Sequence, residues 1–376
     1  MASKFFVLNS ALIRRITAIV MILFVFNAKS NPILQNMVPK VFNRAQSLDA
    51  GISVSWLDQT WNKNILDTIE LKKSDFVLLK TLGFKTIRLP VAFAFFESKG
   101  ISPEKVLNHV DEVVRECNTY GFKLVIDYHY GRLNDTNYQT ETPKIIALWV
   151  NLAKRYRNES PDNLFFELYN EPPHMNPQIW KDAAYNIVTA IRKTDKQRTL
   201  LVGASNYNSI YELSRFVRLA DNNIIYTFHF YEPFFFTHQG AEWVGDQVST
   251  IGVPFPYNGE NFPKLNPKAK NTAGENNYNE YPRDGNEQSV KDKLLIVKNW
   301  ADKNYVPIIC GEYGVYNKYA DPDSRCRYIK AVHSTLKAMH IPGILWDYNT
   351  NFSIFNGPPS VANLPDCMKN AIGYHP

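Results

Sequence analysis

The feature that most constrains the fold is a strand-like run of residues that recurs eight times along the chain, each time followed by a segment with helical periodicity. Several runs are apolar on both faces, which is typical of parallel strands covered by helices on both sides of the sheet. The segments 71–83 and 106–121 have apolar residues at three- and four-residue spacing and end on a glycine that stops a helix. The eight runs are residues 47–56, 85–93, 123–130, 164–171, 199–205, 224–231, 306–314 and 341–349.

Eight strands that alternate with helices predict an α/β protein with a single domain, the (β/α)8 or TIM barrel, in which helices surround a closed parallel barrel. The chain of 376 residues, 45% of them hydrophobic, is long enough to bury such a core. An open, doubly wound sheet is the alternative, but no glycine-rich phosphate turn follows the first run. The segment 232–290 breaks the regular spacing. It is rich in Pro, Asn, Gly and aromatic residues without clear periodicity, so we expect a long loop there.

The N-terminus has the features of a secretory leader. Basic residues precede an uncharged stretch of 11 residues, 16–26, and small residues follow at the positions that a signal peptidase reads. The stretch is much shorter than the roughly 20 residues that cross a bilayer as a helix, so a permanent anchor is the less favoured alternative. We therefore predict a signal peptide over residues 1–30, a barrel domain over 31–376 and a secreted or periplasmic protein without a stable membrane partner.

Charge and cysteine content narrow the class of protein further. The net charge of +6 comes from 42 basic and 36 acidic residues that are spread along the chain, so we expect no nucleic-acid partner. The four cysteines have no C-x-x-C spacing of the kind that indicates zinc or redox chemistry. Cys117 and Cys310 lie in apolar segments and are predicted to be buried thiols, while a Cys326–Cys367 bridge is possible in an exported protein and is left open by the sequence. We expect a monomer.

Polar residues stand at the ends of six of the predicted strands. In an eight-stranded barrel, the functional site forms where the strands end, because the loops that follow the strands make the mouth. Any one of these residues alone is more often structural, but carboxylates, imidazoles and a guanidinium at equivalent positions would be costly to bury without a purpose. In strand order they are Arg88, then Asp127 and His129, Asn170 and Glu171, His229 and Tyr231, Glu312 and Tyr313, and Trp346 and Asp347.

Two glutamates at the mouth indicate cleavage of a glycosidic bond, in which one carboxyl donates a proton to the leaving oxygen and the other attacks the sugar. We predict that Glu171 is the proton donor and Glu312 the nucleophile. Asn170 would direct its amide at the sugar hydroxyl beside the reacting carbon. Arg88 and a hydrogen bond from Tyr231 would favour the charged form of Glu312, while Glu171 would keep its proton to a higher pH.

These residues resemble those of glycoside hydrolase family 5, which includes many endoglucanases and endomannanases. The resemblance covers the barrel from about Gly51 to Phe355, and all eight residue types of the family pattern occur in order at the predicted strand ends. They are Arg88 in TIRLP, His129 in DYHY, Asn170 and Glu171, His229 and Tyr231 in HFY, Glu312 and Trp346.

The resemblance implies a retaining, double-displacement mechanism, with the two carboxyl groups about 5 to 5.5 Å apart. Glu171 would protonate the leaving sugar and then activate water, and Glu312 would form the covalent intermediate. His229 and Tyr231 would orient this pair, and Trp346 would stack on the sugar ring at the cleavage point. We expect neither a metal ion nor another cofactor.

Substrate preference is left open, because the segments 51–61 and 232–290 depart from familiar members and line the cleft in relatives. Aromatic side chains at predicted strand ends and loops favour a β-linked polysaccharide as the partner. We expect an endo-β-1,4-glucanase acting on cellulose-like or mixed-linkage glucan, with mannan, xyloglucan or another β-glycan as the alternative. The aromatic candidates are Trp56, Trp61, Phe95, Phe96, Tyr130, Trp243 and Trp346.

Two readings from other classes stay open. His129, Glu171, His229 and Glu312 could together hold the ion of a metal-dependent barrel hydrolase, although a His-x-His pair at the end of the first strand is missing. The other is a carbohydrate-binding barrel without catalysis, which the intact pair of glutamates disfavours.

Overall fold

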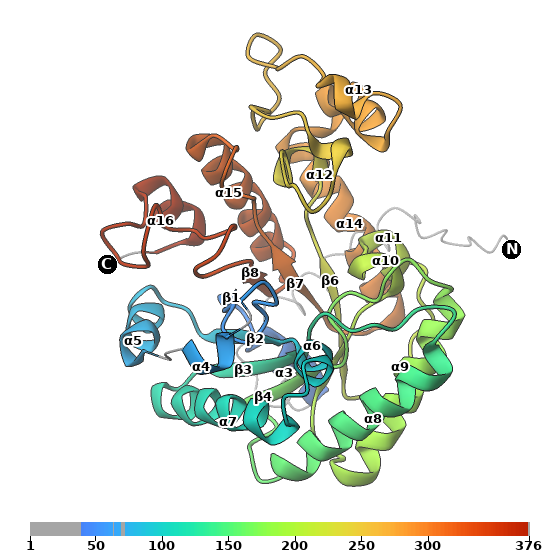
Figure 1. Cartoon of the computed structure of the whole chain (residues 1–376). Helices are drawn as coiled ribbons and strands as arrows, with labels where there is room; N and C mark the ends of the chain where they lie inside the picture. Colours follow the sequence, from blue (N-terminus) through green and yellow to red (C-terminus); the bar gives the residue numbers. More distant parts are fainter. Residues whose placement is uncertain (1–38, 63, 69–71, 375–376) are drawn as a thin grey trace, which may run out of the picture.

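The computed structural model describes residues 39–62, 64–68 and 72–374, and its centre is a closed barrel of eight parallel strands in sequence order (Figure 1). Pairing of Gly51 with Ile344 closes the barrel between the first and last strands. Each strand falls within one of the eight predicted runs, and the predicted (β/α)8 fold is confirmed. The strands are β1 Gly51–Ser53, β2 Thr86–Val91, β3 Lys123–Tyr128, β4 Leu164–Glu167, β5 Leu200–Val202, β6 Ile224–His229, β7 Ile308–Tyr313 and β8 Gly343–Leu345.

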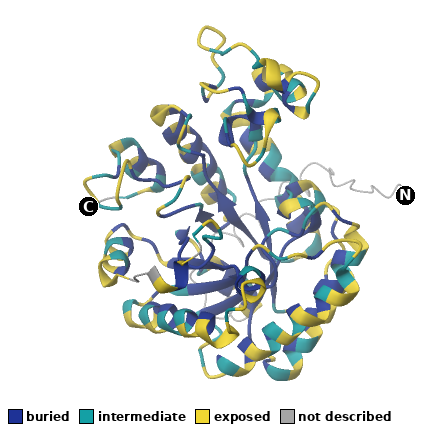
Figure 2. Ribbon diagram, in the orientation of Figure 1, coloured by how far each residue is buried: buried dark blue, intermediate teal, exposed yellow. Residues whose placement is uncertain are grey.

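Helices surround the barrel, and Figure 2 shows buried residues along the strands and exposed residues on the outer sides of the helices. Their bounds follow the chain. Before β6 they are α3 Lys40–Gln46, α4 Ile65–Thr68, α5 Lys73–Thr81, α6 Phe93–Ser98, α7 Pro103–Tyr120, α8 Tyr138–Arg155, α9 Pro177–Thr194, α10 Ser205–Asn208 and α11 Ile210–Leu213. After β6 they are α12 Phe234–Thr237, the 3-10 helices η1 Asp246–Val248 and η2 Pro267–Ala269, α13 Ala273–Asp284, α14 Glu287–Asn304, α15 Pro322–Ala338 and α16 Asp366–Ile372.

Helix α7 shows how local sequence sets the ends of an element. The Ser102 side chain accepts a hydrogen bond from the Lys105 amide, and Pro103 takes the first helical position, where no amide hydrogen is needed. Gly121 ends the helix in a left-handed conformation with φ of 72°, which glycine adopts without a steric penalty. The apolar stripe between these ends packs against the barrel, as the spacing in residues 106–121 predicted.

The barrel interior is filled at one end by apolar side chains and opens at the other into polar ones. Inward-facing side chains of the strands form a compact cluster, and Val41 and Ala45 of α3 pack against this cluster. Because apolar side chains fill this end of the barrel, the polar groups meet at the other end, which is formed by the carboxyl ends of the strands. The inward strand residues are Val125, Phe165, Leu201, Ile225, Ile309 and Ile344.

The segment 232–290 is more ordered than the sequence indicated. It contains α12, η1, η2 and α13, and α14 already begins at Glu287, so the prediction of a long aperiodic loop was wrong for this part (Figure 1). The Thr272 side chain caps α13 by accepting from the Gly274 amide. The helix buries only Gly274 and Tyr281, so it has no apolar stripe that a periodicity search could find.

The Cys326–Cys367 disulfide is present and ties α15 to α16. It closes a loop with a sequence separation of 41 residues. By reducing the conformational entropy of the unfolded chain, a loop of this length stabilises the folded protein by about 4 kcal/mol. Cys117 and Cys310 are free and buried, as predicted.

The predicted signal peptide, residues 1–30, lies outside the described residues, as does the start of the predicted domain at residue 31. Within the ranges that the structure describes, no helix has the length and apolar character needed to cross a membrane.

Candidate active site

Arg88 is the centre of a buried charged cluster in the barrel mouth. It lies within β2, is fully buried, and contacts carboxylates from three other strands. Its Nε is 2.7 Å from Glu167 Oε2, its Nη1 is 2.6 Å from Glu312 Oε1, and its Nη2 is 3.1 Å from Asp127 Oδ2. One guanidinium therefore serves three carboxyl groups, and the cluster favours keeping at least one of them protonated.

Arg88 also orients Asn170, which lies shortly after the end of β4. Its Nη2 donates a 2.8 Å hydrogen bond to Asn170 Oδ1. A guanidinium has only donors, so the amide oxygen must face it, and the NH2 group of Asn170 is left to donate elsewhere. This is the orientation in which Asn170 can direct its amide at a substrate hydroxyl.

Glu312 in β7 is held by two donors. Arg88 Nη1 binds one oxygen, and the Tyr231 hydroxyl donates a 2.8 Å hydrogen bond to the other. Both contacts were expected from the sequence. Burial raises the pKa of Glu312 above its ordinary value and outweighs the opposing effects of His229 and Arg88.

Glu171 has a different environment. Its side chain is 31% exposed, and His229 Nδ1 lies 2.7 Å from its Oε1. Burial raises the pKa of Glu171 to about 7, with His129 and Arg88 opposing the rise. This carboxyl can therefore hold a proton near neutral pH, as an acid catalyst must.

The two glutamates face each other across the mouth. Oxygen atoms of Glu171 and Glu312 and a ring nitrogen of His229 lie within 4.8 Å of one another. This separation fits the about 5 to 5.5 Å of retaining glycosidases and not the roughly 6.5 to 9.5 Å that leaves room for a water in inverting ones.

His129 and Trp346 form a stacked pair at the ends of β3 and β8. Their rings are nearly parallel, with centroids 5.6 Å apart and an interplanar angle of 6°. His129 Nδ1 lies 2.6 Å from Asp127 Oδ2, and burial lowers the pKa of this imidazole to about 4, so the ring is neutral. The contact with His129 fixes the orientation of the Trp346 ring, which is partly buried at the end of β8.

A family model described as Cellulase (glycosyl hydrolase family 5) matches residues 46–352. The chain belongs to glycosyl hydrolase family 5. It is 33% identical over 330 residues to Endoglucanase C of Acetivibrio thermocellus, covering 82% of this chain and 94% of that relative. It is 29% identical over 367 residues to Endoglucanase 3 of Fibrobacter succinogenes. This match includes 90% of this chain but 54% of that relative, so this chain spans about half of the relative's length.

Solved structures share the fold. The structure of Thermotoga maritima Cel5A in complex with cellobiose superposes with a TM-score of 0.71 at 24% identity, covering 88% of this chain and 99% of that one. The same enzyme in complex with mannotriose gives a TM-score of 0.70 at 24% identity over 88% and 99% of the two chains. The resemblance to family 5 that the strand-end residues indicated is confirmed.

All eight residues of the family 5 pattern lie at one mouth, but some of the predicted stacking residues are buried and others are exposed. Trp56 is only 4% exposed and packs in the core against Phe76 and Tyr348, so its predicted role as a sugar platform is corrected to a structural one. Phe96 is likewise buried. A ring enclosed on both faces cannot stack on a ligand.

Trp243 has the exposure that a sugar-stacking residue requires. It is 58% exposed in the segment between β6 and β7, and its ring lies edge-on to Tyr316, with centroids 4.9 Å apart. Trp61 and Tyr130 are also exposed, at 63% and 44%. Tyr130 lies beside His129, with ring centroids 4.4 Å apart, which places it at the mouth.

Glu167 is the member of the cluster that sequence reasoning missed. It occurs in the run LFFELY, two residues after the inward-facing Phe165, and side chains two apart on a strand share a face. A carboxylate on the inward face of a buried strand needs a buried partner. That pattern was available in the sequence and points to Arg88.

The metal alternative is not favoured. In the described part of the chain, Glu171, His229 and Glu312 form the group whose geometry could hold an ion, and His129 is not a member of it. Two observations argue against a dication there. Arg88 already places a positive charge 2.6 Å from Glu312, and His229 Nδ1 is already bonded to Glu171.

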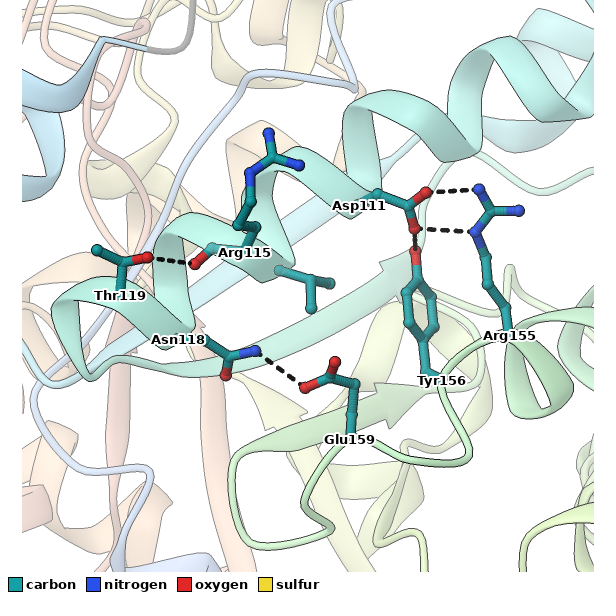
Figure 3. Close-up of a pocket in the computed structure, with 8 residues that line it drawn as sticks. Asp111, Arg115, Asn118, Thr119, Arg155, Tyr156 and Glu159 are labelled. Carbon is teal, nitrogen blue, oxygen red and sulfur yellow. Dashed lines mark hydrogen bonds and ion pairs between the residues drawn. The ribbon is translucent and has the colours of Figure 1, made fainter.

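A hollow on the outer surface, between α7 and α8, belongs to a different part of the molecule (Figure 3). Its polar groups bond to one another: Arg155 and Tyr156 to Asp111, and Asn118 to Glu159. None of the strand-end residues lines it. It is not part of the candidate active site.

Proposed function

We propose that this protein is a retaining endo-β-1,4-glucanase that acts on cellulose-like or mixed-linkage glucan. The observation that carries the proposal is the pair Glu171 and Glu312, with oxygen atoms within 4.8 Å and unequal environments. Relatives named endoglucanases support the choice of glucan.

In the first step, a Glu312 oxygen attacks the anomeric carbon and forms a covalent glycosyl ester. Glu171 gives its proton to the departing glycosidic oxygen, so the leaving sugar departs as a neutral alcohol. The Asn170 amide, fixed by Arg88, donates to the hydroxyl beside the reacting carbon as positive charge develops on the ring.

In the second step, Glu171 is a carboxylate and takes a proton from water as the water attacks the anomeric carbon. The ester bond breaks, Glu312 leaves as a carboxylate, and Glu171 is protonated again. Arg88 and Tyr231 receive the returning negative charge at 2.6 and 2.8 Å, which makes Glu312 a good leaving group.

Mannan is the second candidate substrate, because the structural neighbour from Thermotoga maritima has been solved with mannotriose as well as cellobiose. Glucose and mannose units differ at the hydroxyl beside the anomeric carbon, which is the hydroxyl assigned to Asn170. Reducing ends released from carboxymethylcellulose, barley β-glucan, xyloglucan and mannan would decide between them. Hydrolysis of mannan alone would overturn the glucan assignment.

The catalytic roles are tested with Glu171→Gln and Glu312→Gln. Both variants should lose polymer hydrolysis. Azide should restore turnover of 2,4-dinitrophenyl β-cellobioside only in Glu171→Gln, because this substrate needs no acid and azide needs no base. NMR of the first product should show the β-anomer. An α-anomer first, or full activity in either variant, would contradict the proposal.

We also propose that the protein is exported to a periplasm or secreted, with residues 1–30 removed near Asn31. The leader-like sequence supports this, and so does the Cys326–Cys367 disulfide, since such bonds persist in oxidising compartments. N-terminal sequencing of the exported chain tests it, and retention of Met1 would contradict it.

A further inference from the structure

Three successive residues after β5 have a backbone conformation that side chains rarely adopt. Asn206, Tyr207 and Asn208 have φ angles of 57°, 60° and 54°, in the left-handed region. Asparagine enters this region more easily than most residues, but usually singly. Three in a row must be held by specific contacts, and such strain is concentrated at functional sites.

The contacts are with the segment that carries Glu171. The Asn206 amide donates to Pro173 O at 3.0 Å, and the Tyr207 amide donates to Pro172 O at 2.8 Å. Asn208 Nδ2 donates to Asn170 O. The left-handed turn therefore holds carbonyl groups on both sides of Glu171.

The Asn208 amide makes a second contact, with His229. Its Nδ2 lies 3.4 Å from His229 Nε2. The amide cannot be turned over, because Oδ1 would then face Asn170 O and two acceptors would meet. An NH2 group thus faces Nε2, so Nε2 must be the nitrogen without a proton and Nδ1 must carry it.

This tautomer has a consequence for the acid. His229 Nδ1 lies 2.7 Å from Glu171 Oε1, so its proton is donated to that oxygen. Oε1 then cannot present a proton toward the ring, and the acidic proton of Glu171 must reside on Oε2. Without Asn208, the ring could adopt the other tautomer and accept the proton of Glu171 at Nδ1.

The surroundings of Asn208 fit a residue kept for its NH2 group. It is fully buried, and its Oδ1 has no hydrogen-bond partner among the described residues. Gly203 makes room for it, since a Cβ at that position would lie 1.8 Å from Asn208 Oδ1. A buried carbonyl without a partner is unfavourable, and its retention needs a compensating role.

We propose that Asn208 is a positioning residue for catalysis: it fixes the His229 tautomer and thereby places the acidic proton of Glu171 on Oε2. The inference rests on the proposed glycosidase function for its kinetic consequence, but not for the tautomer itself. Among the other ionisable groups that act on Glu171 or His229, Glu312 also faces the ring, since its Oε2 lies 3.4 Å from His229 Nδ1 and favours a proton on that same nitrogen. Asn208 is the group that acts on the tautomer from the Nε2 side. The remaining ionisable groups are Arg88, Asp127, His129, Glu167 and Tyr231.

The tautomer is tested on the unmodified protein by NMR of 15N-labelled histidine, with a His229→Gln variant to assign the signals. The expected result is a protonated Nδ1 and a bare Nε2 at neutral pH. Burial lowers the pKa of His229 to about 4, so the neutral ring is the form observed. A protonated Nε2 would overturn the proposal, whether or not the protein hydrolyses any glucan.

The kinetic consequence is tested with Asn208→Ala and a matched control, Asn206→Ala. Both replace a left-handed asparagine by alanine, but the hydrogen bond from residue 206 comes from the backbone and survives. On cellotetraose, whose leaving group needs a proton, Asn208→Ala should lose about 100-fold in kcat/KM. On 2,4-dinitrophenyl β-cellobioside, whose leaving group needs none, kcat/KM should change only a few-fold.

The pH profile separates positioning from general damage. Donation by Nδ1 favours the charged form of Glu171, so loss of this donation should move the alkaline limb of kcat/KM up by about one pH unit in Asn208→Ala. Asn206→Ala should keep the limb in place. Equal behaviour of the two variants would overturn the positioning role. An unmodified protein inactive on all glucans, with the expected tautomer, would instead count against the proposed function.

Discussion

Arg88 and Arg155 bind carboxylates with the same guanidinium geometry but in opposite surroundings. Arg88 is fully buried among Glu167, Glu312 and Asp127, while Arg155 is 24% exposed and binds Asp111 with Nε at 2.8 Å (Figure 3). In the outer cluster, burial raises the pKa of Asp111, but hydrogen bonds from Arg155 and Tyr156 outweigh it and the pKa is lowered.

The buried cluster gives the opposite result. Burial raises the pKa of Asp127 to about 7 although Arg88 opposes the rise, and the pKa values of Glu167 and Glu312 are raised as well. One arginine shared by three buried carboxyls cannot offset their desolvation, whereas one arginine for a partly hydrated carboxylate can. Burial and the ratio of charges, rather than the ion pairs themselves, thus determine where protons are held.

The largest effect is expected from Arg88→Met, which removes the one positive charge of the buried cluster. Three carboxyls would lose their positive partner, with Tyr231 still bonded to Glu312 and His129 to Asp127, and stability should fall by about 3 to 5 kcal/mol. The pKa of Glu312 should rise further, and the loss of its donor should lower kcat/KM about 1,000-fold. Urea unfolding and assays on barley β-glucan measure both quantities.

Arg88→Lys is the control for Arg88→Met, since it keeps the charge but not the fork. It should recover part of the stability. If Arg88→Met were as stable and as active as the unmodified protein, the assigned role of burial in this cluster would be wrong.

Glu167→Gln changes the ratio of charges without removing the arginine. The amide oxygen can still accept from Arg88 Nε, but the amide NH2 then faces the donor Nη2, so one of the two hydrogen bonds is lost and Arg88 keeps two charged partners instead of three. Because Glu167 orients Arg88, which in turn binds Glu312, kcat/KM should fall by about 10-fold. A loss as large as that of Arg88→Met would show that Glu167 has a more direct role than orientation.

The pH dependence of kcat/KM tests the effect of burial on Glu171. The protonated form is the active acid, and its pKa is raised to about 7, so kcat/KM should fall about tenfold per pH unit above that value. On the acid side, activity should fall as Glu312 is protonated, at a higher pH than for an ordinary glutamate. A rate that stays constant to pH 9 would mean that Glu171 is not the acid.

The difference between buried and exposed regions also explains what the sequence could predict. The eight strands were predictable because their runs are apolar on both faces, and the strand-end residues followed because the topology brings those ends together. Helix α13 was missed because it buries only Gly274 and Tyr281. Its polar sequence has no stripe to detect.

Side-chain direction outside regular elements was the other limit. Trp56 follows β1, and whether its ring faces the cleft or Phe76 of α5 depends on packing that no local pattern encodes. The left-handed conformation of Asn206 to Asn208 is likewise set by its hydrogen bonds to the segment after β4. Glu167 was different, since a charge on an inward strand face is visible in the sequence.

The smallest effect is expected from Arg155→Ala, which breaks the outer cluster between α7 and α8. Water can solvate Asp111 and Glu104 once the guanidinium is gone, so stability should fall by only about 1 kcal/mol, and kcat/KM should not change. The difference from the unmodified protein should shrink in 1 M NaCl, because salt screens exposed charges. Urea unfolding at two salt concentrations measures this. A loss comparable to that of Arg88→Met would show that partial hydration does not protect the outer cluster, and the contrast between the two arginines would fail.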